Sequence, residues 1–348
     1  MRKKKIHIFY GGFISRKGGV NSNSSTLKEE LDKNFDVSLF SLDNLPLFLR
    51  YLPHFVEKVV NFLFLPQGFF YKDMCTRFLF KFLFKKKTDL IIFQDIYLSW
   101  NSNIPSVTML HAIWSDNLQK YDLAKKKILN LKKKEIKKIN SIKHDICVVS
   151  SKYKKFILEK HFSYKIKKKF KIVELGIRKN SVKKYKRIKK SLIYVGSLEK
   201  RKNIFFLVNV FYKLYKYNKK YLLTIIGNGP EEAQIKKITK TLKLPVKFLG
   251  SKNNDEVLDE LQKHSIYVHT SIKESFSLSL LEAKLCGLIT VGYKYLQIPN
   301  NFIDCPVDEF EENKWFKKII RIKRKNKKFK YKKYLISNMA NKLLRIAK

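Results

Sequence analysis

The sequence predicts an α/β protein of two Rossmann-like domains, each a doubly wound parallel sheet. At 348 residues the chain is longer than one open α/β core usually is. Both halves alternate short apolar runs with amphipathic segments of helical length, which favours parallel strands with helices on both faces. A short basic stretch without a packing pattern, residues 179–190, separates the halves. We therefore expect domains at residues 1–180 and 190–325, joined by that linker.

The first half opens with a strand, a glycine loop and a helix, as a Rossmann unit does. The strand is expected at 6–10, the loop carries Gly11, Gly12, Gly18 and Gly19, and the helix is expected to begin near Ser24. Residues 46–87 are aromatic and basic, and we interpret them as irregular. The remaining elements are strands at 37–40, 90–93, 107–110 and 146–149, a lysine-rich helix at 123–143, and a helix capped by Ser150 and Ser151.

The second half alternates more regularly. A helix from Asn203 carries apolar residues at 204, 207, 208, 211 and 214, the spacing of one buried helical face. The last segment, 331–348, has its own apolar stripe, so we expect a helix that crosses back onto the first domain. The other expected elements are strands at 192–195, 221–226, 246–249, 266–269 and 288–291, and helices starting at 231 and 255 and passing through 280–285.

The charge of the chain is strongly unbalanced. There are 75 Lys and Arg against 29 Asp and Glu, a net charge of +46. One explanation is a partner with negative charge, either nucleic acid or an anionic membrane surface. The other is compositional drift in an A- and T-rich coding sequence. No nucleic-acid-binding motif is present and the basic residues are spread along the chain, so we expect no nucleic-acid partner.

The cysteines and the amino terminus bear on the compartment. Cys75, Cys147, Cys286 and Cys305 have no CxxC spacing and no accompanying His cluster, which indicates a reducing compartment and no metal site. The apolar run after the basic start ends at Gly11, too early for a signal peptide. The sequence contains no run of 18 uncharged apolar residues, so we expect no membrane-spanning helix. We expect a cytoplasmic protein.

The loops that follow strands are the expected ligand sites, because open parallel sheets bind ligands beyond the carboxyl ends of their strands. The richest is residues 271–287, with Glu274 in the loop and Glu282 in the following helix. Taken alone, these could be a solvated loop acid and an exposed helix position. Alternatively, both flank a helix N-terminus that can cradle a diphosphate through the N–H groups around Phe276, Ser277, Leu278 and Ser279.

This stretch resembles the E-x7-E signature of retaining glycosyltransferases with the GT-B fold, most closely family 4. The loop with Gly196 and Ser197 resembles the family's glycine loop and leads to its donor-binding lysine, here Lys202. The turn with Gly227 and Asn228 is similar to the family's G-x-G-P-E turn. Gly18 and Gly19 match the acceptor-side loop, and His111 matches a site histidine at a strand end. The resemblance covers nearly the whole chain in the right order.

The departures from the family pattern lie in the same loops. Ser197 stands where many relatives have a phosphate-binding arginine, so Arg201 is expected to substitute. Ser275 and Ser277 replace the usual glycines beside Phe276. His264 and His269 have no motif support, and we interpret both as structural.

The resemblance implies two domains facing a central cleft, with the acceptor bound by the first and a nucleotide-sugar donor by the second. It implies that Glu274 positions the donor sugar, that Glu282 binds the ribose, and that His111 reaches the sugar. Lys202 and Arg201 would neutralise the leaving diphosphate. The sequence contains no Asp-x-Asp, so we expect a metal-independent hexosyltransferase-like enzyme without a cofactor.

The expected function is transfer of a sugar, with retention, to a glycan or lipid-linked acceptor in bacterial cell-surface polysaccharide or lipopolysaccharide synthesis. The alternatives are a nucleotide-sugar epimerase, a catalytically dead binding subunit or, from another class, a nucleic-acid-binding protein. The aromatic and basic residues of 49–87 suit contact with the inner face of the cytoplasmic membrane. Packing of these aromatics under the first domain explains them equally well.

Overall fold

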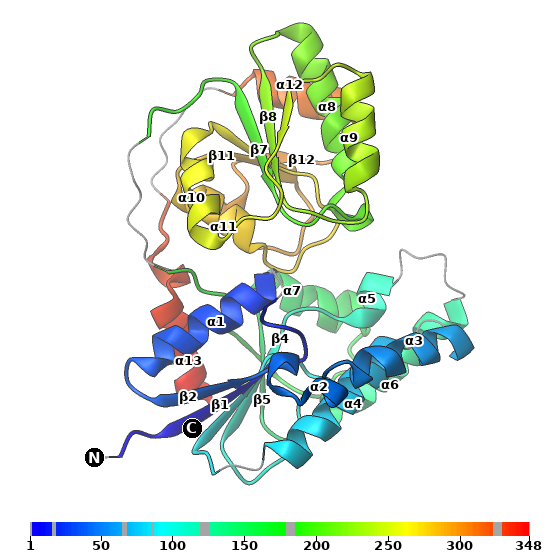
Figure 1. Ribbon diagram of the computed structural model, residues 1–348, viewed down its shortest axis with the longest axis vertical. Helices are drawn as coiled ribbons and strands as arrows, with labels where there is room; N and C mark the ends of the chain where they lie inside the picture. Colours follow the sequence, from blue (N-terminus) through cyan, green and yellow to red (C-terminus); the bar gives the residue numbers. More distant parts are fainter. Residues whose placement is uncertain are drawn as a thin grey trace. The chain divides into compact units, whose positions relative to one another are not determined.

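The computed structural model describes residues 2–15, 19–64, 68–84, 87–118, 125–178, 185–322 and 329–347. The chain forms two compact units (Figure 1). Unit 1 comprises Met1–Arg178 and Tyr334–Lys348, and unit 2 comprises Lys179–Lys333. Each unit contains a six-stranded sheet whose neighbouring strands all run parallel. The predicted class, two parallel-sheet α/β domains, is confirmed.

The sheet of unit 1 has the strand order β2-β1-β3-β4-β5-β6. Its central strands are buried along their whole length, as expected when helices cover both faces of a parallel sheet. The short edge strand β6 was not foreseen from the sequence. The strands are β1 (Lys5–Phe9), β2 (Asp36–Phe40), β3 (Leu90–Phe93), β4 (Ser106–Leu110), β5 (Asp145–Val148) and β6 (Phe170–Ile172).

The expectation of irregular structure over 46–87 is wrong. Most of this stretch is helical, in α2 (Leu47–Arg50), α3 (Leu52–Phe64) and α4 (Gly68–Leu83). These helices carry apolar residues on more than one side, so the single stripe that marks an amphipathic helix is missing. The other helices of unit 1 are α1 (Gly19–Asp32), α5 (Trp114–Leu118), α6 (Lys125–Ser141), α7 (Ser151–Lys155) and α13 (Ile336–Ile346).

Helix α1 begins at Gly19, well before the expected start near Ser24. Its first turns are rich in polar residues, which disfavour helix interiors in sequence-based reasoning. One of them has a buried structural role: the Asn23 side chain donates to the Gly176 carbonyl at 3.0 Å. Ser150, by contrast, caps α7 as expected, because its hydroxyl accepts from the Tyr153 N–H at 3.0 Å.

The carboxyl-terminal helix α13 packs within unit 1, against α1. The chain enters it through backbone pairing, with Ile177 N–H donating to Tyr334 O and Ile336 N–H to Ile177 O, each at 2.9 Å. Lys342 forms an ion pair with Glu174 at 2.6 Å. The buried side of α13 consists of Ile336, Met339, Ala340 and Leu343.

Unit 2 has the strand order β12-β11-β10-β7-β8-β9. The strands are β7 (Ser191–Val195), β8 (Leu222–Ile226), β9 (Val246–Phe248), β10 (Ile266–His269), β11 (Ile289–Tyr293) and β12 (Cys305–Val307). The helices are α8 (Ile204–Tyr217), α9 (Glu232–Thr241), α10 (Asn254–Lys263), α11 (Leu278–Leu285) and α12 (Glu312–Ile320). The stripe predicted for α8 is buried in the core of this unit.

Part of the expected linker, residues 179–190, is bound to unit 2. Residues 179–184 lie outside the described residues, but 185–190 are held by unit 2. The Arg187 guanidinium donates to the carbonyls of Cys286 and Gly287, and the Ile188 N–H donates to Lys263 O at 2.9 Å. Across the described ranges, no helix is both long and apolar enough to cross a membrane.

Candidate active site

The carboxyl ends of β7, β8 and β10 bring the predicted donor-side residues of unit 2 together. These strands are neighbours in the sheet, in the order β10-β7-β8. The loops that leave them therefore meet at one edge, although they are distant in sequence.

The two glycine loops of this edge are joined by backbone hydrogen bonds. Gly196 N–H donates to Ile226 O at 3.0 Å, and Leu198 N–H donates to Asn228 O at 2.9 Å. Gly227 has φ +130°, and a Cβ built on it would lie 1.9 Å from the Gly196 carbonyl oxygen. Only glycine fits there, because a side chain would collide with backbone. The Ser197 hydroxyl donates a hydrogen bond to Glu199 Oε1 at 2.7 Å.

A short 3-10 turn, Lys200–Lys202, follows the first glycine loop. Its carbonyls anchor the loop after β10: Ile272 N–H donates to Arg201 O at 3.0 Å, and the Thr270 hydroxyl donates to Lys202 O at 2.9 Å. These bonds fix the loop that carries Glu274 against the turn that carries the two cations.

Glu274 lies between the cations of that turn. Its carboxylate accepts a hydrogen bond from Lys202 Nζ, and Arg201 Nη1 lies 3.7 Å from Oε1. Burial alone would raise the pKa of Glu274, but the positive charges, above all Lys202, lower it to about 2. The side chain is 11% exposed. Glu274 is therefore an ionised, ion-paired carboxylate and not a solvated loop acid.

His269, interpreted from the sequence as structural, belongs to this cluster. It is the last residue of β10, and its Nε2 lies 3.6 Å from Glu274 Oε1. The ring is buried, and neither nitrogen has a hydrogen-bond partner among the described residues. Burial lowers the pKa of His269 to about 3, so the ring is neutral at pH 7. The signal available in the sequence was its position at the carboxyl end of a predicted strand.

Glu282 has a different environment from Glu274. It projects from α11 and accepts a hydrogen bond from Asn254 Nδ2 at 2.7 Å, and among the described residues no cation pairs with it. Burial raises its pKa to about 7, and the Asn254 bond offsets only part of that shift. Asn254 was not identified from the sequence, because only the fold places α10 beside α11.

The start of α11 combines a cap with a strained backbone. Ser277 has φ +70°, in a region that favours glycine, and its hydroxyl accepts from the Leu280 N–H at 3.4 Å. The side chain of Phe276 is buried and packs edge-on against Phe302, with ring centroids 5.2 Å apart. Leu278 opens the helix, and the Ser279 hydroxyl accepts from Tyr267 at 2.8 Å. The first N–H groups of the helix have no preceding turn to bond to, so they can receive an anion.

The corresponding edge of unit 1 carries His111, directly after β4. His111 is buried, and its Nε2 lies 2.9 Å from Gln94 Oε1 at the end of β3. Burial lowers the pKa of His111 to about 4, so the ring is neutral and donates from Nε2 to Gln94. Gln94 was not singled out from the sequence. Of the predicted glycine loop, Gly18 lies outside the described residues and Gly19 is the exposed first residue of α1.

Acidic groups on this edge have raised pKa values. Asp95 follows Gln94, and Asp73 projects from α4. Burial raises the pKa of Asp73 to about 7, and burial together with the charge of Asp73 raises that of Asp95 well above its usual value. Tyr10, after β1, has its pKa raised to about 12 by burial and by these acids. This edge therefore offers hydrogen bonds more than fixed charge.

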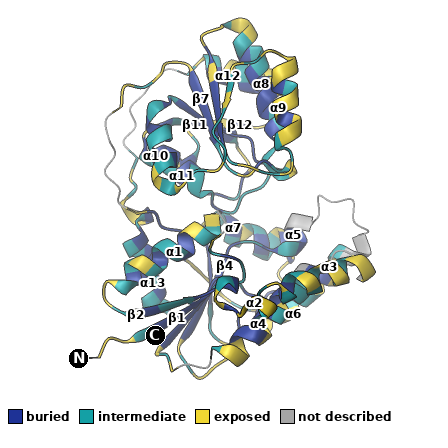
Figure 2. Cartoon of the chain, in the orientation of Figure 1, coloured by how far each residue is buried: buried dark blue, intermediate teal, exposed yellow. Residues whose placement is uncertain are grey.

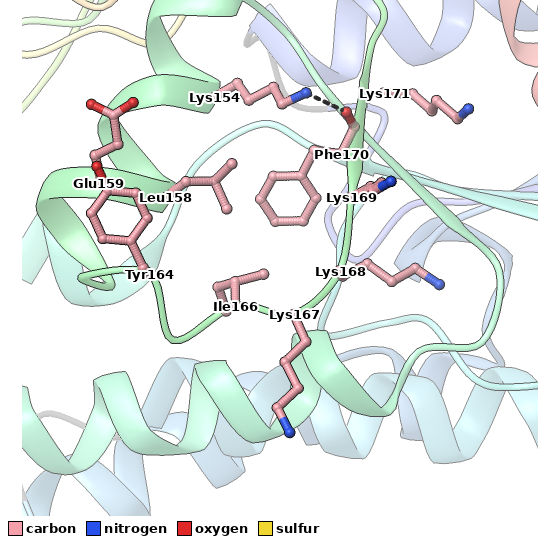
Figure 3. A pocket seen from close by; sticks show the side chains of 10 residues that line it. All are labelled: Lys154, Leu158, Glu159, Tyr164, Ile166, Lys167, Lys168, Lys169, Phe170 and Lys171. Atoms are coloured by element: carbon pink, nitrogen blue, oxygen red, sulfur yellow. Dashed lines mark hydrogen bonds between the residues drawn. The ribbon is translucent and has the colours of Figure 1, made fainter.

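A separate pocket in unit 1 contains none of the predicted site residues (Figure 3). Two of its lysines donate to backbone carbonyls: Lys154 to Phe170 O at 2.8 Å and Lys168 to Lys143 O at 2.8 Å. Its lining is Lys154, Leu158, Glu159, Tyr164, Ile166, Lys167, Lys168, Lys169, Phe170 and Lys171. For the parts of the chain that are described, no group of three or more His, Cys, Asp or Glu side chains is placed to hold a metal ion.

Comparison with known families supports a glycosyl transferase. Residues 177–340, a little under half of the chain, match the family described as glycosyl transferases group 1. Segments of this chain also match curated relatives. One segment is 29% identical over 111 residues to the phosphatidylinositol N-acetylglucosaminyltransferase gpi3 subunit of Schizosaccharomyces pombe. Another match is 33% identical over 110 residues to N-acetyl-alpha-D-glucosaminyl L-malate synthase of Bacillus anthracis. These segments cover 31% and 32% of this chain but only 24% and 29% of the relatives, so the chain spans less than a third of either.

Solved structures share the fold over nearly the whole chain. Sucrose-phosphate synthase from Thermosynechococcus elongatus has a TM-score of 0.66 at 15% identity, covering 99% of this chain and 95% of that one. WaaG, a glycosyltransferase involved in lipopolysaccharide biosynthesis, has 0.66 at 12%, covering 90% and 89%. Anabaena HepE, in complex with UDP and glucose, has 0.58 at 16%, covering 99% and 94%.

The fold is that of the GT-B glycosyltransferases, and the sequence match supports the broad group 1 family. Together they support a transferase.

Proposed function

We propose that this protein is a family 4 retaining glycosyltransferase that moves a sugar from a nucleotide-diphosphate donor to a glycan or lipid-linked acceptor. The observation that carries the proposal is the convergence of Lys202 and Arg201 on the ionised Glu274, beside the N-terminus of α11. The group 1 match over 177–340 includes all of these residues.

The cations would serve the leaving group. As the glycosidic bond breaks, negative charge grows on the diphosphate, and fixed positive groups stabilise that charge more than the ground state. Lys202, Arg201 and the N–H groups at the start of α11 would supply such groups, although Arg201 is also paired with Glu199 at 2.8 Å. Each donor of this kind contributes about 3 kcal/mol to barrier lowering in well-studied sites.

Glu274 would hold the donor sugar. With a pKa near 2 it stays ionised at pH 7, so it cannot act as a general acid. An ionised carboxylate can accept hydrogen bonds from sugar hydroxyls and can stabilise positive charge at the anomeric carbon. Retention follows if the acceptor attacks the face that the diphosphate leaves, with a phosphate oxygen taking the proton.

Glu282 would bind the ribose. Asn254 occupies one of its oxygens at 2.7 Å, which leaves acceptor capacity for the ribose hydroxyls. Hydroxyl donors favour the ionised form, so the donor would lower the raised pKa of this carboxyl when it binds.

In unit 1, the neutral His111, oriented by Gln94, would contact the sugar, and the neighbouring loop with Gly18 and Gly19 would serve the acceptor. We propose that no metal or cofactor is needed and that nucleic acid is not a partner. The two curated relatives are named for N-acetylglucosamine chemistry, and HepE was crystallised with UDP, so UDP-N-acetylglucosamine is the first donor to test. WaaG is named for lipopolysaccharide biosynthesis, which supports a cell-surface glycan as the acceptor class.

The test is incubation with a panel of radiolabelled nucleotide sugars, with and without glycan and lipid-linked acceptors, in the presence and absence of EDTA. We expect acceptor-dependent transfer of one sugar, unaffected by EDTA. Interconversion of donor sugars without acceptor would indicate an epimerase and contradict the proposal. Reversible loss of turnover with EDTA would contradict the metal-independent mechanism.

A further inference from the structure

Unit 1 carries an unusual concentration of exposed apolar side chains on three successive helices. Five phenylalanines of the described chain are strongly exposed, and all five lie on α2, α3 and α4. Exposed residues recur along α3 and α4 (Figure 2). Large exposed apolar patches mark contact sites in soluble proteins. We call this surface the α2–α4 face; its exposed apolar members are Leu47, Phe48, Tyr51, Phe55, Val59, Phe62, Leu63, Met74, Phe78, Phe82 and Leu83.

The exposed residues form one stripe per helix. On α3, Phe55, Val59 and Phe62 recur at spacings of four and three. On α4, Phe78 and Phe82 are one turn apart, with parallel rings whose centroids are 6.5 Å apart. Residues at these spacings share a side of a helix, so each helix turns one apolar side outward.

The opposite side of α4 is packed in the core. Phe80 is fully buried and Leu79 is 8% exposed, in a cluster with Phe9, Phe40 and Phe93 of the sheet. The core contact is therefore complete without Phe78 and Phe82. The sequence left open whether the aromatics of this region pack under the domain or face outward, and the structure shows that they do both.

The charge on the α2–α4 face is positive. Lys58 and Lys81 are exposed between the apolar residues. Residues 47–64 and 68–84 contain two carboxylates only, and neither projects freely: the Glu57 side chain is 15% exposed and bonds to His54, and Asp73 is 6% exposed. A second copy of this chain would present the same positive face, which disfavours self-association here.

We propose that the α2–α4 face docks on an anionic lipid bilayer, with its phenylalanines in the headgroup layer and its lysines on acidic headgroups. Bulky aromatics beside Lys are the residues that interfacial helices use, and Lys side chains near an anionic leaflet are attracted to its acidic headgroups. The face deepens the proposed function by bringing the acceptor-side unit to a lipid-borne acceptor at the inner face of the cytoplasmic membrane. Lipid binding is measured without turnover, so a failure of membrane docking can be distinguished from a failure of the proposed sugar transfer.

The test is flotation of the full chain with vesicles of phosphatidylcholine alone and with about 30% phosphatidylglycerol. We expect binding to the anionic vesicles, weakened by added salt because surface charges are screened, and little binding to the neutral ones. Absence of binding to the anionic vesicles overturns the proposal.

Two paired substitutions test the face itself: Phe55→Ser with Phe62→Ser, and Phe78→Ser with Phe82→Ser. Each should reduce anionic vesicle binding at least about tenfold, because two apolar side chains no longer enter the bilayer. The matched control is Tyr217→Ser on α8, which removes an aromatic that is 64% exposed in unit 2 and should leave binding unchanged.

Two measurements keep these results interpretable. Unchanged circular dichroism and thermal melting show that the variants fold, as expected for exposed positions. Light scattering after gel filtration reports self-association. Wild-type vesicle binding by both variants would overturn the proposal, and so would a wild-type dimer that the same substitutions dissociate, since that would assign the face to a second copy.

Discussion

The two sheets end in chemically different edges. In unit 2, Lys202 and Arg201 surround a carboxylate whose pKa is held near 2. In unit 1, the corresponding edge carries His111, neutral with a pKa of about 4, and acids such as Asp73 with a pKa of about 7. An edge rich in fixed positive charge suits a diphosphate, and an edge of neutral donors and acceptors suits sugar hydroxyls. We therefore propose that residues following the strands of one fold serve two kinds of recognition in this chain.

The same contrast recurs inside unit 2. Glu274 and Glu282 are eight positions apart, yet their pKa values are about 2 and about 7. Burial raises both pKa values. The difference arises because cations lie beside Glu274, whereas Glu282 is bonded to the neutral Asn254 amide, which lowers its pKa much less. Glu274 is therefore ionised at pH 7, whereas Glu282 titrates near pH 7.

The largest effect is expected from Lys202→Ala. It removes the main counter-charge of both Glu274 and the proposed diphosphate, so kcat should fall about 10²- to 10³-fold and nucleotide affinity should drop. The matched control is Lys200→Ala, which removes an exposed lysine from the same turn and should change neither value much. Equal losses in the two variants would show that general positive charge matters and the position of Lys202 does not.

Donor binding should depend on pH through Glu282. The carboxyl has a pKa of about 7, and ribose hydroxyls prefer its ionised form, so affinity is full above pH 7 and is lost as the pH falls through 7. The decline should approach tenfold per pH unit, the limit for one proton. Calorimetric titration with a nucleotide sugar, which does not itself titrate in this range, measures it.

Glu282→Gln should flatten that pH profile. A Glu274→Gln variant serves as the comparison, since Glu274 is ionised throughout and its loss should leave the slope in place. A slope that survives in Glu282→Gln would assign the titration to another group.

On the unit 1 edge, Gln94→Leu should lower kcat/KM about tenfold. The substitution removes the acceptor at 2.9 Å from His111 Nε2 and leaves a buried donor unsatisfied, which costs about 1–3 kcal/mol. Nitrogen NMR of the His111 ring should show loss of the single tautomer, and Gln94→Glu, which retains an acceptor, should restore it. An unchanged tautomer in Gln94→Leu would show that Gln94 does not orient the ring.

The smallest effect is expected at the start of α11. Ser277→Gly relieves a positive φ that costs a non-glycine residue about 1 kcal/mol, and it loses a cap that glycine replaces at a few tenths. The free energy of unfolding should therefore rise slightly or stay level. Ser275→Gly, where φ is not positive, should lower it by about 0.5 kcal/mol. Urea unfolding that ranks the two variants in the opposite order would contradict the strain at Ser277.

Periodicity predicted α8 and the strands other than the short edge strands β6 and β12, because a parallel strand is a short apolar run and α8 has one buried stripe. It failed for α3 and α4, because their outward sides are as apolar as their inward sides. The exposed phenylalanines that obscure the helical pattern in the sequence belong to the α2–α4 face.

Motifs led to part of the candidate site, and strand order determines the rest. Glu274, Glu282 and Lys202 were proposed from their motifs, and the structure places Lys202 against Glu274. His269 was missed because its contact with Glu274 depends on β10 lying beside β7, which residue spacing does not reveal. Gln94 was missed for the same reason, since it reaches His111 from the adjacent strand β3.

We propose that the edge around Glu274 performs glycosyl transfer. The most direct measurement is the turnover of radiolabelled UDP-N-acetylglucosamine and the other donors of the panel by wild type and Glu274→Gln, assayed side by side with product anomers resolved by NMR. We expect one accepted donor, a product with retained configuration, and turnover at least about 100-fold lower in Glu274→Gln. Equal turnover by the two proteins, or an inverted product, would contradict it.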